Sequence, residues 1–541
     1  MKLTNDGIHG AENIKAWKSA GYSLPEYDRE KLRQNTKQNP FWIHFGCGNL
    51  FRAFQAHTAH KLLNNKTLER GIIAAEGFDY EIIDKVSRPH DDLTLLTTLK
   101  SDGTVEKTVI GSITDSFKLD SGDTAEFDEL KRIFRSKSLQ LASFTITEKG
   151  YSLTNAGSEL YPDVKSDFSS GPERPQSYMG KVTALLYERF RSGAAPLAMV
   201  SMDNCSHNGD KLFKAINAFA VEWEKNGLAD RGFKDYIQNP ASVSFPWTMI
   251  DKITPRPDPK IQEILKNDGV ENTKPTVTAK NTYTAPFVNA EECEYLVIED
   301  SFPNGRPELE NGGIIFTDRE TVEKTERMKV CTCLNPLHTA LAIFGCLLGY
   351  RLISGEMKDP LLRELVKGIG YNEGLPVVTD PGIIEPKEFL DSVIQTRLPN
   401  PFMPDSPQRI ATDTSQKLAI RFGETIKAYQ KSHDLYVNNL KLIPLVFAGW
   451  IRYLMGIDDD GNKFELSPDP YLETARRYVK DIKIGKNTDI SEAIKPLLSD
   501  SEVFGVNLYE AGLAEKVIDY LKEMTTSIGA VRKTLEKAVN D

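Results

Sequence analysis

Short apolar runs typical of buried strands alternate with helical patterns through the first half of the chain. This alternation constrains the fold more than any other feature. The strand patterns lie at residues 41–45, 71–75, 139–146 and 195–202, and the helical patterns at 52–64, 178–191 and 209–226. Such alternation is typical of a parallel sheet with helices on both faces.

The first strand pattern ends in a glycine turn. Residues 41–45 are followed by Gly46-Cys-Gly48-Asn49, and a helical pattern begins near Arg52. A strand, a G-x-G turn and a helix N-terminus together present free amide groups to a pyrophosphate. The third glycine of the full fingerprint is absent, and an ordinary strand-to-helix turn explains the pattern equally well. Gly46, Gly48, Asn49 and Arg52 are the candidate cofactor-binding residues.

An acidic residue, Glu76, follows the second strand pattern. Dinucleotide-binding domains place a carboxylate there to bind the adenosine ribose, and it favours NAD over NADP because it repels a 2′-phosphate. Asp79 is the less favoured candidate for this role. The alternative is a solvated carboxylate at a strand end.

Beyond about residue 320 the pattern changes to consecutive helices, predicted at 323–350, 360–369, 386–396, 416–432, 435–455, 468–480, 489–498 and 510–539. Residues 1–39 are polar and lack a clear period. We therefore expect an N-terminal extension (1–39) packed on a domain surface and a Rossmann-type dinucleotide-binding domain (40–320). A mostly α-helical substrate and catalytic domain (321–541) is expected to follow.

Composition excludes several classes of protein. Lys and Arg total 67 against 77 Asp and Glu, and this net charge of −10 without a basic stretch argues against nucleic acid as a partner. Six cysteines are too few for a disulfide scaffold. The longest apolar runs, 337–350 and 442–455, are shorter than the roughly 18 residues of a membrane span, and the N-terminus lacks the apolar core of a signal peptide. We expect a cytoplasmic protein, monomeric or a small homo-oligomer, that acts on a small molecule.

A second chemical signal opens the helical half. Lys329, Asn335 and His338 follow one another closely, and the last two share a helix face. A lysine can act as general acid and base, an asparagine amide can stabilise a developing alkoxide, and a histidine can orient hydroxyl groups. From spacing alone, the preferred interpretation is structural: a polar start of a surface helix, with Asn335 as N-cap followed by proline.

Six ordered segments carry a family resemblance. They are residues 44–53, 145–151, 201–209, 245–255, 297–307 and 409–417. Together they resemble the long-chain polyol dehydrogenase family, which includes mannitol 2-dehydrogenase, fructuronate reductase and tagaturonate reductase. The resemblance covers about residues 40–425 and implies reversible hydride transfer between NAD and a secondary alcohol or ketone of a sugar derivative, without a metal.

The resemblance also assigns roles to residues. It implies that Lys329 is the acid/base, that Asn335 and Asn204 form the oxyanion hole and that His338 lies beside them. It implies further that three residues contact the substrate, namely Asp251, Arg409 and Lys417.

The lysine is displaced by one position. The family places it five residues before the asparagine, whereas Lys329 lies six before Asn335. On a regular helix the extra residue rotates the side chain by about 100°. Either a local bulge or a non-helical start absorbs the extra residue, or another base, such as Lys324, is used. We expect a bulge.

Other candidate residues are given structural interpretations. Cys331 and Cys333 with His338 lack a fourth zinc ligand in sequence reach, so we expect buried thiols and no metal. His207 is expected to be structural. Glu148 and Lys149 either line the nicotinamide pocket or form an ion pair.

The substrate is the least constrained property. Chain length and the residues around Lys329 look most like the fructuronate reductase (D-mannonate oxidoreductase) branch. A hexuronate carries a carboxylate that Arg409 and Lys417 can clamp, helped by Arg256 or Lys252. Tagaturonate reductase and mannitol 2-dehydrogenase activities are alternatives. A sugar-acid isomerase, epimerase or non-redox relative is an alternative of another class, which the displaced lysine supports.

Overall fold

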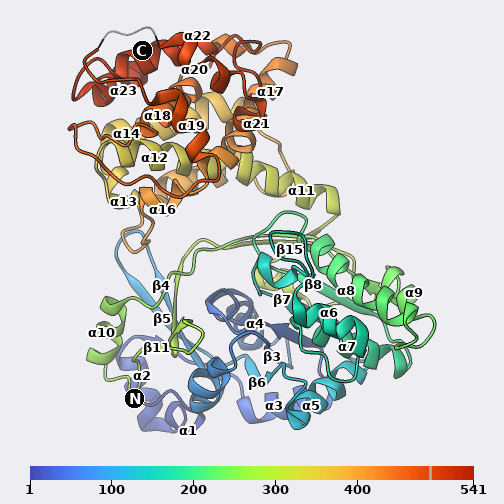
Figure 1. The fold of residues 1–541 in the computed structure, drawn as a ribbon. Helices are drawn as coiled ribbons and strands as arrows, with labels where there is room; N and C mark the ends of the chain where they lie inside the picture. The colour runs from blue at the N-terminus through green and yellow to red at the C-terminus, as the bar shows by residue number, and fades with distance from the viewer. Residues whose placement is uncertain (487–489, 541) are drawn as a thin grey trace. The chain divides into compact units, whose positions relative to one another are not determined.

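The structure is a computed structural model that describes residues 1–486 and 490–540. The chain divides into two compact units. Unit 1 comprises Met1–Lys100 and Thr104–Val322, and unit 2 comprises Ser101–Gly103 and Glu323–Asp541 (Figure 1). Each unit is described separately below.

Unit 1 contains a six-stranded sheet with the order β6-β3-β2-β7-β8-β9. Every pairing within it is parallel. The strands are β2 (Trp42–Phe45), β3 (Ile72–Glu76), β6 (Ile113–Lys118), β7 (Leu141–Phe144), β8 (Leu197–Ser201) and β9 (Val243–Ser244). The predicted parallel sheet is confirmed.

Alternate side chains of the strands enter two separate cores. Ile43 and Phe45 of β2 belong to one hydrophobic cluster, and Trp42 belongs to the other. The first core is covered by α5 (Thr124–Arg135), α7 (Tyr178–Arg191) and α8 (Asn208–Lys225). The second is covered by α4 (Ala56–Asn64) and by strands β13 (Phe287–Glu291) and β14 (Tyr295–Glu299). A central strand buried on both faces explains its continuous apolar sequence.

The N-terminal segment is built into unit 1 more deeply than expected. It forms α1 (Asn5–Ile8), α2 (Ala11–Ser19), β1 (Tyr22–Ser23) and α3 (Arg29–Gln38). Trp17 is fully buried, and the buried Arg29 guanidinium donates to the carbonyls of Gly111 and Ile113 at 3.0 Å each. The segment is therefore part of the fold of unit 1, whereas we expected packing on its surface.

Smaller sheets complete unit 1, and the alternation of strands and helices did not predict them. A four-stranded sheet has the order β1-β5-β4-β13, and a three-stranded sheet the order β10-β14-β15. Strands β11 and β12 form a short hairpin. Their bounds are β4 (Thr94–Leu99), β5 (Val105–Ile110), β10 (Thr248–Asp251), β11 (Thr276–Val277), β12 (Tyr283–Thr284) and β15 (Ile315–Thr317). The remaining α-helices of unit 1 are α6 (Pro162–Ser170), α9 (Phe233–Gln238) and α10 (Pro259–Asn267).

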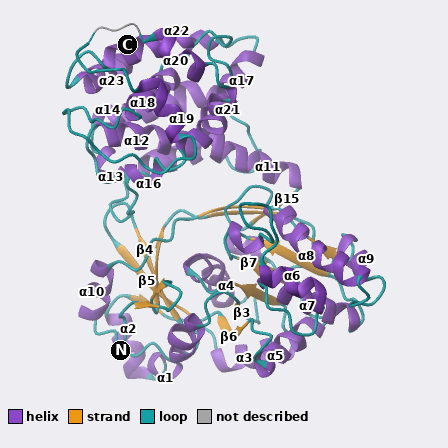
Figure 2. Cartoon of the chain, viewed as in Figure 1, coloured by secondary structure: helices purple, strands orange, loops and turns teal. Residues whose placement is uncertain are grey.

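Among the described residues, unit 2 is formed by helices and loops (Figure 2). After α11 (Arg319–Arg327), which crosses the boundary between the units, come η6 (Met328–Cys333), α12 (Asn335–Leu347), α13 (Ile353–Glu356), α14 (Pro360–Lys367), α15 (Pro386–Ser392), α16 (Pro407–Ile410), α17 (Glu424–Lys431), α18 (Leu442–Tyr453), α19 (Leu472–Val479), α20 (Ser491–Leu498), α21 (Ser501–Phe504), α22 (Ala514–Met524) and α23 (Ala530–Asn540). Helices α12 and α18 are buried nearly all round and pack against each other. The predicted mostly helical second half is confirmed.

Glycine breaks one predicted helix into two. The pattern at 510–539 predicts a single helix, but α22 ends at Met524 and α23 begins at Ala530. Gly529, directly before α23, has a φ of 77°, which a continuous right-handed helix does not allow and which suits glycine.

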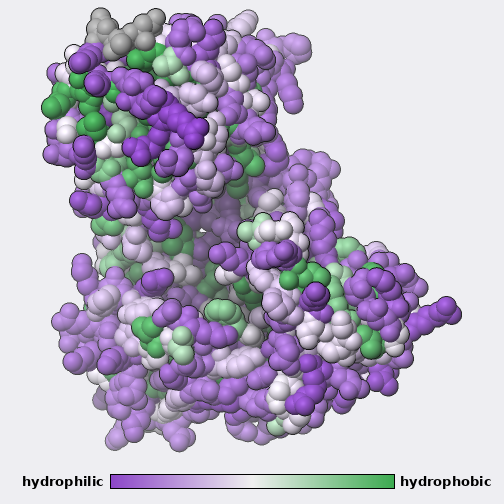
Figure 3. Space-filling model, in the orientation of Figure 1, coloured by the Kyte–Doolittle hydropathy of each residue, from purple (hydrophilic) through white to green (hydrophobic). Residues whose placement is uncertain are grey.

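One helical stretch, Arg319–Leu347, is long and apolar enough to cross a membrane by length and composition, but 83% of its apolar window is buried. This burial matches the core helix of a folded domain. The faces visible in Figure 3 carry mostly hydrophilic residues with scattered apolar ones, as on an ordinary globular surface.

Candidate active site

The glycine turn follows β2 and leads directly into a helix. Gly46 has a φ of 103°, and a Cβ atom there would lie 2.2 Å from the carbonyl oxygen of Thr145, so only glycine fits. Its amide donates to the carbonyl of Ala75 at 2.8 Å. At Gly48 an added Cβ would meet no atom within 4 Å, and the helix begins at Asn49. The first glycine makes the turn, and the second leaves the backbone open to a ligand.

Glu76, at the end of β3, joins the turn to the next strand. One carboxylate oxygen, Oε2, accepts from the amide of Cys47 at 2.8 Å. The other, Oε1, accepts from the amides of Phe78 at 2.8 Å and Asp79 at 3.0 Å. Burial raises the pKa of this carboxyl, and the three amides oppose that shift. Glu76 is therefore a structural acceptor as well as the candidate ribose ligand.

A pocket of about 540 Å³ opens along these elements. Its wall consists of Gly46, Gly48, Glu76, Phe78, Ile82, Thr145, Ile146, Thr147, Lys149, Gly150, Ser152, Leu153, Tyr161, Asp163, Val164, Ser177, Tyr178, Met179 and Thr282. The open backbone at Gly48 and the carboxylate of Glu76 fit the pyrophosphate and ribose of a dinucleotide. The structure thus brings three predicted cofactor residues, Gly46, Gly48 and Glu76, to one pocket.

The other two predicted cofactor residues face a different environment. Arg52 is 4% exposed and donates to the carbonyl of Ala285 at 2.7 Å and to Oδ1 of Asn49 at 3.0 Å. Desolvation lowers the pKa of its guanidinium to about 10. Asn49 donates in turn to the carbonyl of Pro255 at 3.5 Å. Arg52 therefore binds the protein interior and fixes Asn49, and a direct contact of either residue with a cofactor stays a prediction.

A hydrogen-bonded histidine that the sequence analysis did not consider lies under the turn. His44 is fully buried, with Nε2 2.8 Å from Oγ1 of Thr145 and Nδ1 2.7 Å from Oγ of Ser143. Its ring stacks on Phe51 with the centroids 4.0 Å apart. Phe51 stands where the usual fingerprint has its third glycine, so this stacking accounts for the departure. Thr145, which His44 holds, lines the pocket.

The ends of β7 and β8 are joined by Asp203. Its carboxylate accepts from the amides of Ile146 at 3.0 Å and Thr147 at 2.9 Å, and from the hydroxyl of Tyr151 at 2.5 Å. This network joins the segments at 145–151 and 201–209. Asn204, the predicted oxyanion residue of unit 1, follows directly and is exposed.

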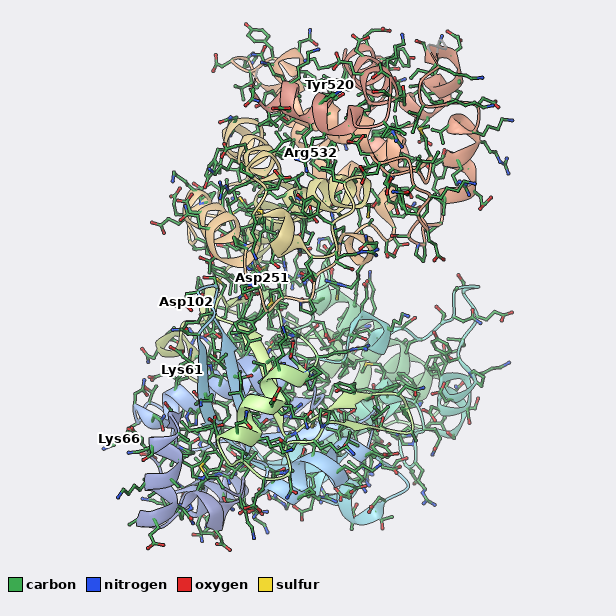
Figure 4. The ribbon with its side chains drawn as sticks, turned by 90° about the vertical axis from the view of Figure 1, so that its left-hand side faces the viewer. Lys61, Lys66, Asp102, Asp251, Tyr520 and Arg532 are labelled. Carbon is green, nitrogen blue, oxygen red and sulfur yellow. The ribbon has the colours of Figure 1, made fainter. Side chains whose placement is uncertain are left out.

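Asp251 is the last residue of strand β10 in unit 1, and Lys252 follows it. Asp251, labelled in Figure 4, is 6% exposed. The ammonium group of Lys252 lies 2.9 Å from a carboxylate oxygen of Glu294, which also pairs with Lys61 at 2.8 Å. These two ammonium groups lower the pKa of the Glu294 carboxyl to about 2, against the opposing effect of burial. Lys252, considered as a carboxylate clamp, is therefore engaged by Glu294.

Three further sequence candidates belong to unit 1. Lys149 lines the pocket, whereas Glu148 forms an ion pair with Lys211 at 3.2 Å. One of the two expected alternatives, pocket lining, therefore applies to Lys149, and the other, an ion pair, to Glu148. His207 stacks on Trp247 with ring centroids 4.2 Å apart. This packing is consistent with the structural role expected for His207.

In unit 2, Lys329 lies within a π-helical segment, Met328–Cys333. The amide of Leu334 donates to the carbonyl of Lys329 at 3.1 Å, five residues back, instead of the four of an α-helix. The expected bulge is confirmed. The Lys329 side chain is buried, with 3% of its surface exposed.

Asn335 and His338 stand at the start of α12. Nε2 of His338 is 3.6 Å from a carboxylate oxygen of Asp405. Desolvation lowers the pKa of His338 to about 4, and Asp405 opposes this shift while neighbouring arginines add to it. The imidazole is therefore neutral near pH 7, so it can accept one hydrogen bond and donate another.

A group of cations surrounds this histidine. Arg409 forms an ion pair with Asp405, and Arg397, Arg409 and Arg421 all act on the charge of His338. Arg421 is anchored by its hydrogen bond of 2.5 Å to Oγ1 of Thr339. Sequence reasoning missed Arg397, Asp405 and Arg421, because their clustering depends on the folding of α12, α16 and the π segment at 419–423.

Lys417, also predicted to contact the substrate, forms hydrogen bonds with backbone carbonyl groups. Its ammonium group donates to the carbonyl of Thr412 and, at 3.5 Å, to that of Ile410. Desolvation lowers its pKa, and Arg421 and Arg409 contribute to the shift. Lys417 therefore adds positive charge near Arg421 and orders the loop after α16.

The two cysteines beside Lys329 are buried, as expected. Cys331 is 7% exposed, and Cys333, with no exposed surface, lies 3.7 Å from the carbonyl oxygen of Pro386. Burial raises the pKa of Cys333 to about 12, so its thiol stays protonated and unreactive.

The predicted site residues thus form two groups. Gly46, Gly48 and Glu76 share the pocket of unit 1. Lys329, Asn335, His338 and Arg409 lie on the π segment, α12 and α16 of unit 2. Asn204 and Asn335 belong to different units, so their joint oxyanion hole stays a prediction.

Comparison with known families agrees with this division. The family model "Mannitol dehydrogenase Rossmann domain" matches residues 41–311, and the model "Mannitol dehydrogenase C-terminal domain" matches residues 321–525. Together these models cover most of the chain.

Individual relatives are similar over nearly their full length. The chain is 55% identical to the D-mannonate oxidoreductase of Thermotoga maritima over 541 residues, which is 100% of this chain and 99% of that protein. It is 28% identical to the D-mannonate oxidoreductase of Escherichia coli over 90% of this chain and 91% of that one. The mannitol 2-dehydrogenase of Pseudomonas fluorescens, solved as a ternary complex with NAD and D-mannitol, is 26% identical, with a TM-score of 0.67 and full coverage of both chains.

Proposed function

This chain belongs to the mannitol dehydrogenase family, and from that premise we propose that it is an NAD-dependent oxidoreductase interconverting D-fructuronate and D-mannonate. It is an enzyme that acts on CH–OH groups, as its family relatives do. The observation that carries the choice of substrate is the 55% identity, end to end, to a D-mannonate oxidoreductase. We place this activity in the cytoplasm.

The pocket of unit 1 supports the choice of cofactor. Bound NAD supplies the hydride acceptor, and NADH the hydride donor, for the oxidation or reduction of the sugar carbon. Gly48 exposes backbone to the pyrophosphate, and Glu76 disfavours a 2′-phosphate. The Pseudomonas fluorescens enzyme was solved with NAD bound, which agrees with this choice.

Lys329 is the proposed proton-transferring group. During reduction a carbonyl oxygen gains negative charge, and a lysine ammonium group protonates it. During oxidation the neutral amine removes the proton from the hydroxyl. The amide groups of Asn335 and Asn204 donate hydrogen bonds to the same oxygen in this proposal. The π turn supports the assignment because it absorbs the residue that would otherwise rotate Lys329 away from its expected direction.

The cations of unit 2 support an acidic substrate. Arg409 presents a guanidinium group with 62% of its side-chain surface exposed, beside the mostly buried Arg421 and Arg397. A guanidinium group binds a carboxylate in a two-pronged geometry that matches the acid end of a hexuronate. Neutral His338 and the buried Asp251 are the proposed partners of the sugar hydroxyls. The substrate of a polyol dehydrogenase carries no carboxylate for these cations to bind.

The test compares NADH oxidation with D-fructuronate, D-tagaturonate and D-fructose. We expect turnover of fructuronate above the other two ketones. Arg409→Gln is expected to raise the KM for fructuronate by roughly ten-fold or more, since it removes a charged hydrogen bond. Arg351→Gln, the same change at an exposed arginine of unit 2, serves as the control and should leave KM unchanged. Preference for another ketone would contradict the proposed substrate, and interconversion of two sugars without net loss of NADH would indicate an isomerase.

A further inference from the structure

Tyr178 lines the dinucleotide pocket and carries a buried hydroxyl group. The residue opens helix α7 directly after the N-cap Ser177, and it lines the pocket together with Gly46 and Glu76. Its ring packs so closely on Gly77 that a Cβ atom there would lie 2.4 Å from the ring. The phenol oxygen is buried and has no hydrogen-bond partner among residues 1–486 and 490–540.

An unsatisfied buried phenol is unusual, because buried tyrosine hydroxyls normally find a hydrogen-bond partner. The neighbouring tyrosines of unit 1 follow that rule. Tyr151 bonds to Ser201 and Asp203, and Tyr80 donates to the carbonyl of Leu119 at 2.9 Å. Tyr178 is the exception beside the pocket.

Two carboxylates that act on Tyr178, those of Glu76 and Asp203, already accept hydrogen bonds from other groups. Glu76 accepts from three backbone amides, and Asp203 accepts from two amides and from Tyr151. Both carboxylates act electrostatically on Tyr178, and burial together with these charges raises the pKa of its phenol. The hydroxyl therefore remains a protonated donor that lacks an acceptor.

The position of the Tyr178 hydroxyl in the dinucleotide site indicates which ligand atoms can accept its hydrogen bond. The glycine turn and Glu76 mark where the diphosphate and the adenosine ribose of a dinucleotide bind. Those groups are rich in oxygen acceptors, and a phenol donating to an ionised phosphate forms a strong, charge-assisted bond.

We propose that the hydroxyl of Tyr178 donates a hydrogen bond to an oxygen of the ADP half of bound NAD or NADH. The inference rests on the proposed dinucleotide site and adds to it a residue that positions the cofactor. Tyr178 has no part in the proton transfer, and it lies in unit 1, whereas Lys329 lies in unit 2.

The experiment uses Tyr178→Phe, which removes only the oxygen. Binding of NADH, and of ADP alone, is measured by calorimetry on the full chain without sugar, and the melting temperature is measured with and without ligand. We expect the affinity for both ligands to fall roughly ten-fold or more. We expect the melting temperature of the free protein to be unchanged or higher, because the variant buries one unsatisfied group fewer. Tyr436→Phe, at a tyrosine outside the pocket that is 66% exposed, is the matched control and should change neither quantity.

Three outcomes would overturn the inference in distinguishable ways. Equal affinity of the variant and the wild type for NADH shows that the hydroxyl does not bind the cofactor, and it leaves the proposed function intact. Weaker binding of NADH with unchanged binding of ADP moves the contact to the nicotinamide half. Absence of NADH binding to the wild type removes both the inference and the proposed function.

Discussion

The amide of Leu334 donates to the carbonyl oxygen of Lys329, five residues back, at 3.1 Å. This π turn inserts one residue into the helical path that leads from α11 into α12. The extra residue between Lys329 and Asn335 therefore does not require the rotation of about 100° that a regular helix would impose. Similar π segments occur at Phe51–Gln55 and Ala419–Gly423, so the turn explains the register and does not by itself identify a catalytic residue.

Replacing Lys329 by alanine tests its proposed role. We expect kcat for fructuronate reduction to fall by about 10²–10⁴-fold, the usual contribution of a general acid or base. NADH affinity should be unchanged, because the glycine turn and its pocket belong to unit 1. Lys324→Ala, which removes the alternative base on α11, is the control. Loss of activity in the control with retention in Lys329→Ala would reassign the base.

Deleting Val330 tests the bulge itself. The deletion restores a spacing of five residues and should convert the π turn into regular α-helix, because one residue fewer must be accommodated. We expect the variant to keep activity within about ten-fold of the wild type, whereas inserting one alanine after Val330 adds a further rotation of about 100° and should abolish it. Steady-state kinetics with a crystal structure of the deletion variant would check both points. An inactive but folded deletion variant would show that the bulge is needed in its own right.

Glu76 has two roles that one substitution separates. Glu76→Ala leaves the amides of Cys47, Phe78 and Asp79 without their carboxylate acceptor, which should cost about 1–3 kcal/mol of folding stability. It also removes the charge that repels a 2′-phosphate, so the ratio of NADPH to NADH activity should rise. Thermal melts and kinetics with both cofactors measure the two effects. Glu148→Ala, at an exposed carboxylate paired with Lys211, should show neither effect. An unchanged cofactor ratio would refute the ribose assignment.

The sequence predicted those parts of the fold that depend on local pattern. Strands β2, β3, β7 and β8 are continuous apolar runs because both faces of the sheet are covered, and helix α7 has the predicted bounds, 178–191. The place of the N-terminal segment within unit 1 was not predicted, because its ordering depends on single long-range contacts. Trp17 and Arg29 are the two buried anchors of a polar stretch, and the carbonyls that Arg29 binds, those of Gly111 and Ile113, lie far along the chain.

The candidate site shows the same limit. Gly46, Gly48 and Glu76 could be found because the chemistry of a strand–turn–helix fixes their spacing. Tyr178 could not be found from the sequence, because its role depends on two features of the folded chain, the packing of its ring on Gly77 and its place in the pocket wall.

Buried histidines should make the protein sensitive to acid. Burial lowers the pKa of His57 to about 4 and that of His60 to about 3. Between these values and the ordinary pKa of about 6.5, the unfolded chain binds more protons than the folded one, so stability falls as the pH drops from about 6.5 toward 4. His57→Gln should reduce the loss of folding free energy at acidic pH by about 3 kcal/mol. The pKa of His57 differs by about 2.5 units between the folded and unfolded chain, and each unit corresponds to about 1.4 kcal/mol. Denaturant melts at about pH 7 and about pH 4.5 measure it, with His433→Gln, at an exposed histidine, as the control. Equal pH sensitivity of the His57 variant and the wild type would contradict the prediction.

Glu356 carries a carboxyl group that folding stabilises only in its neutral form. The side chain has no exposed surface, and neither oxygen has a hydrogen-bond partner among the described residues. Burial, with a smaller contribution from Asp359, raises its pKa well above 4.5. A raised folded pKa means that the unfolded chain releases the proton first, so this residue lowers stability as the pH rises above about 4.5. Glu356→Gln keeps the shape and cannot ionise, and we expect its advantage in melting temperature over the wild type to grow between about pH 6 and pH 8. Glu356→Ala, which leaves a cavity beside Gly345, should instead lower stability at every pH. A glutamine variant less stable than the wild type across this range would mean that the carboxylate is ionised and bound in the folded protein.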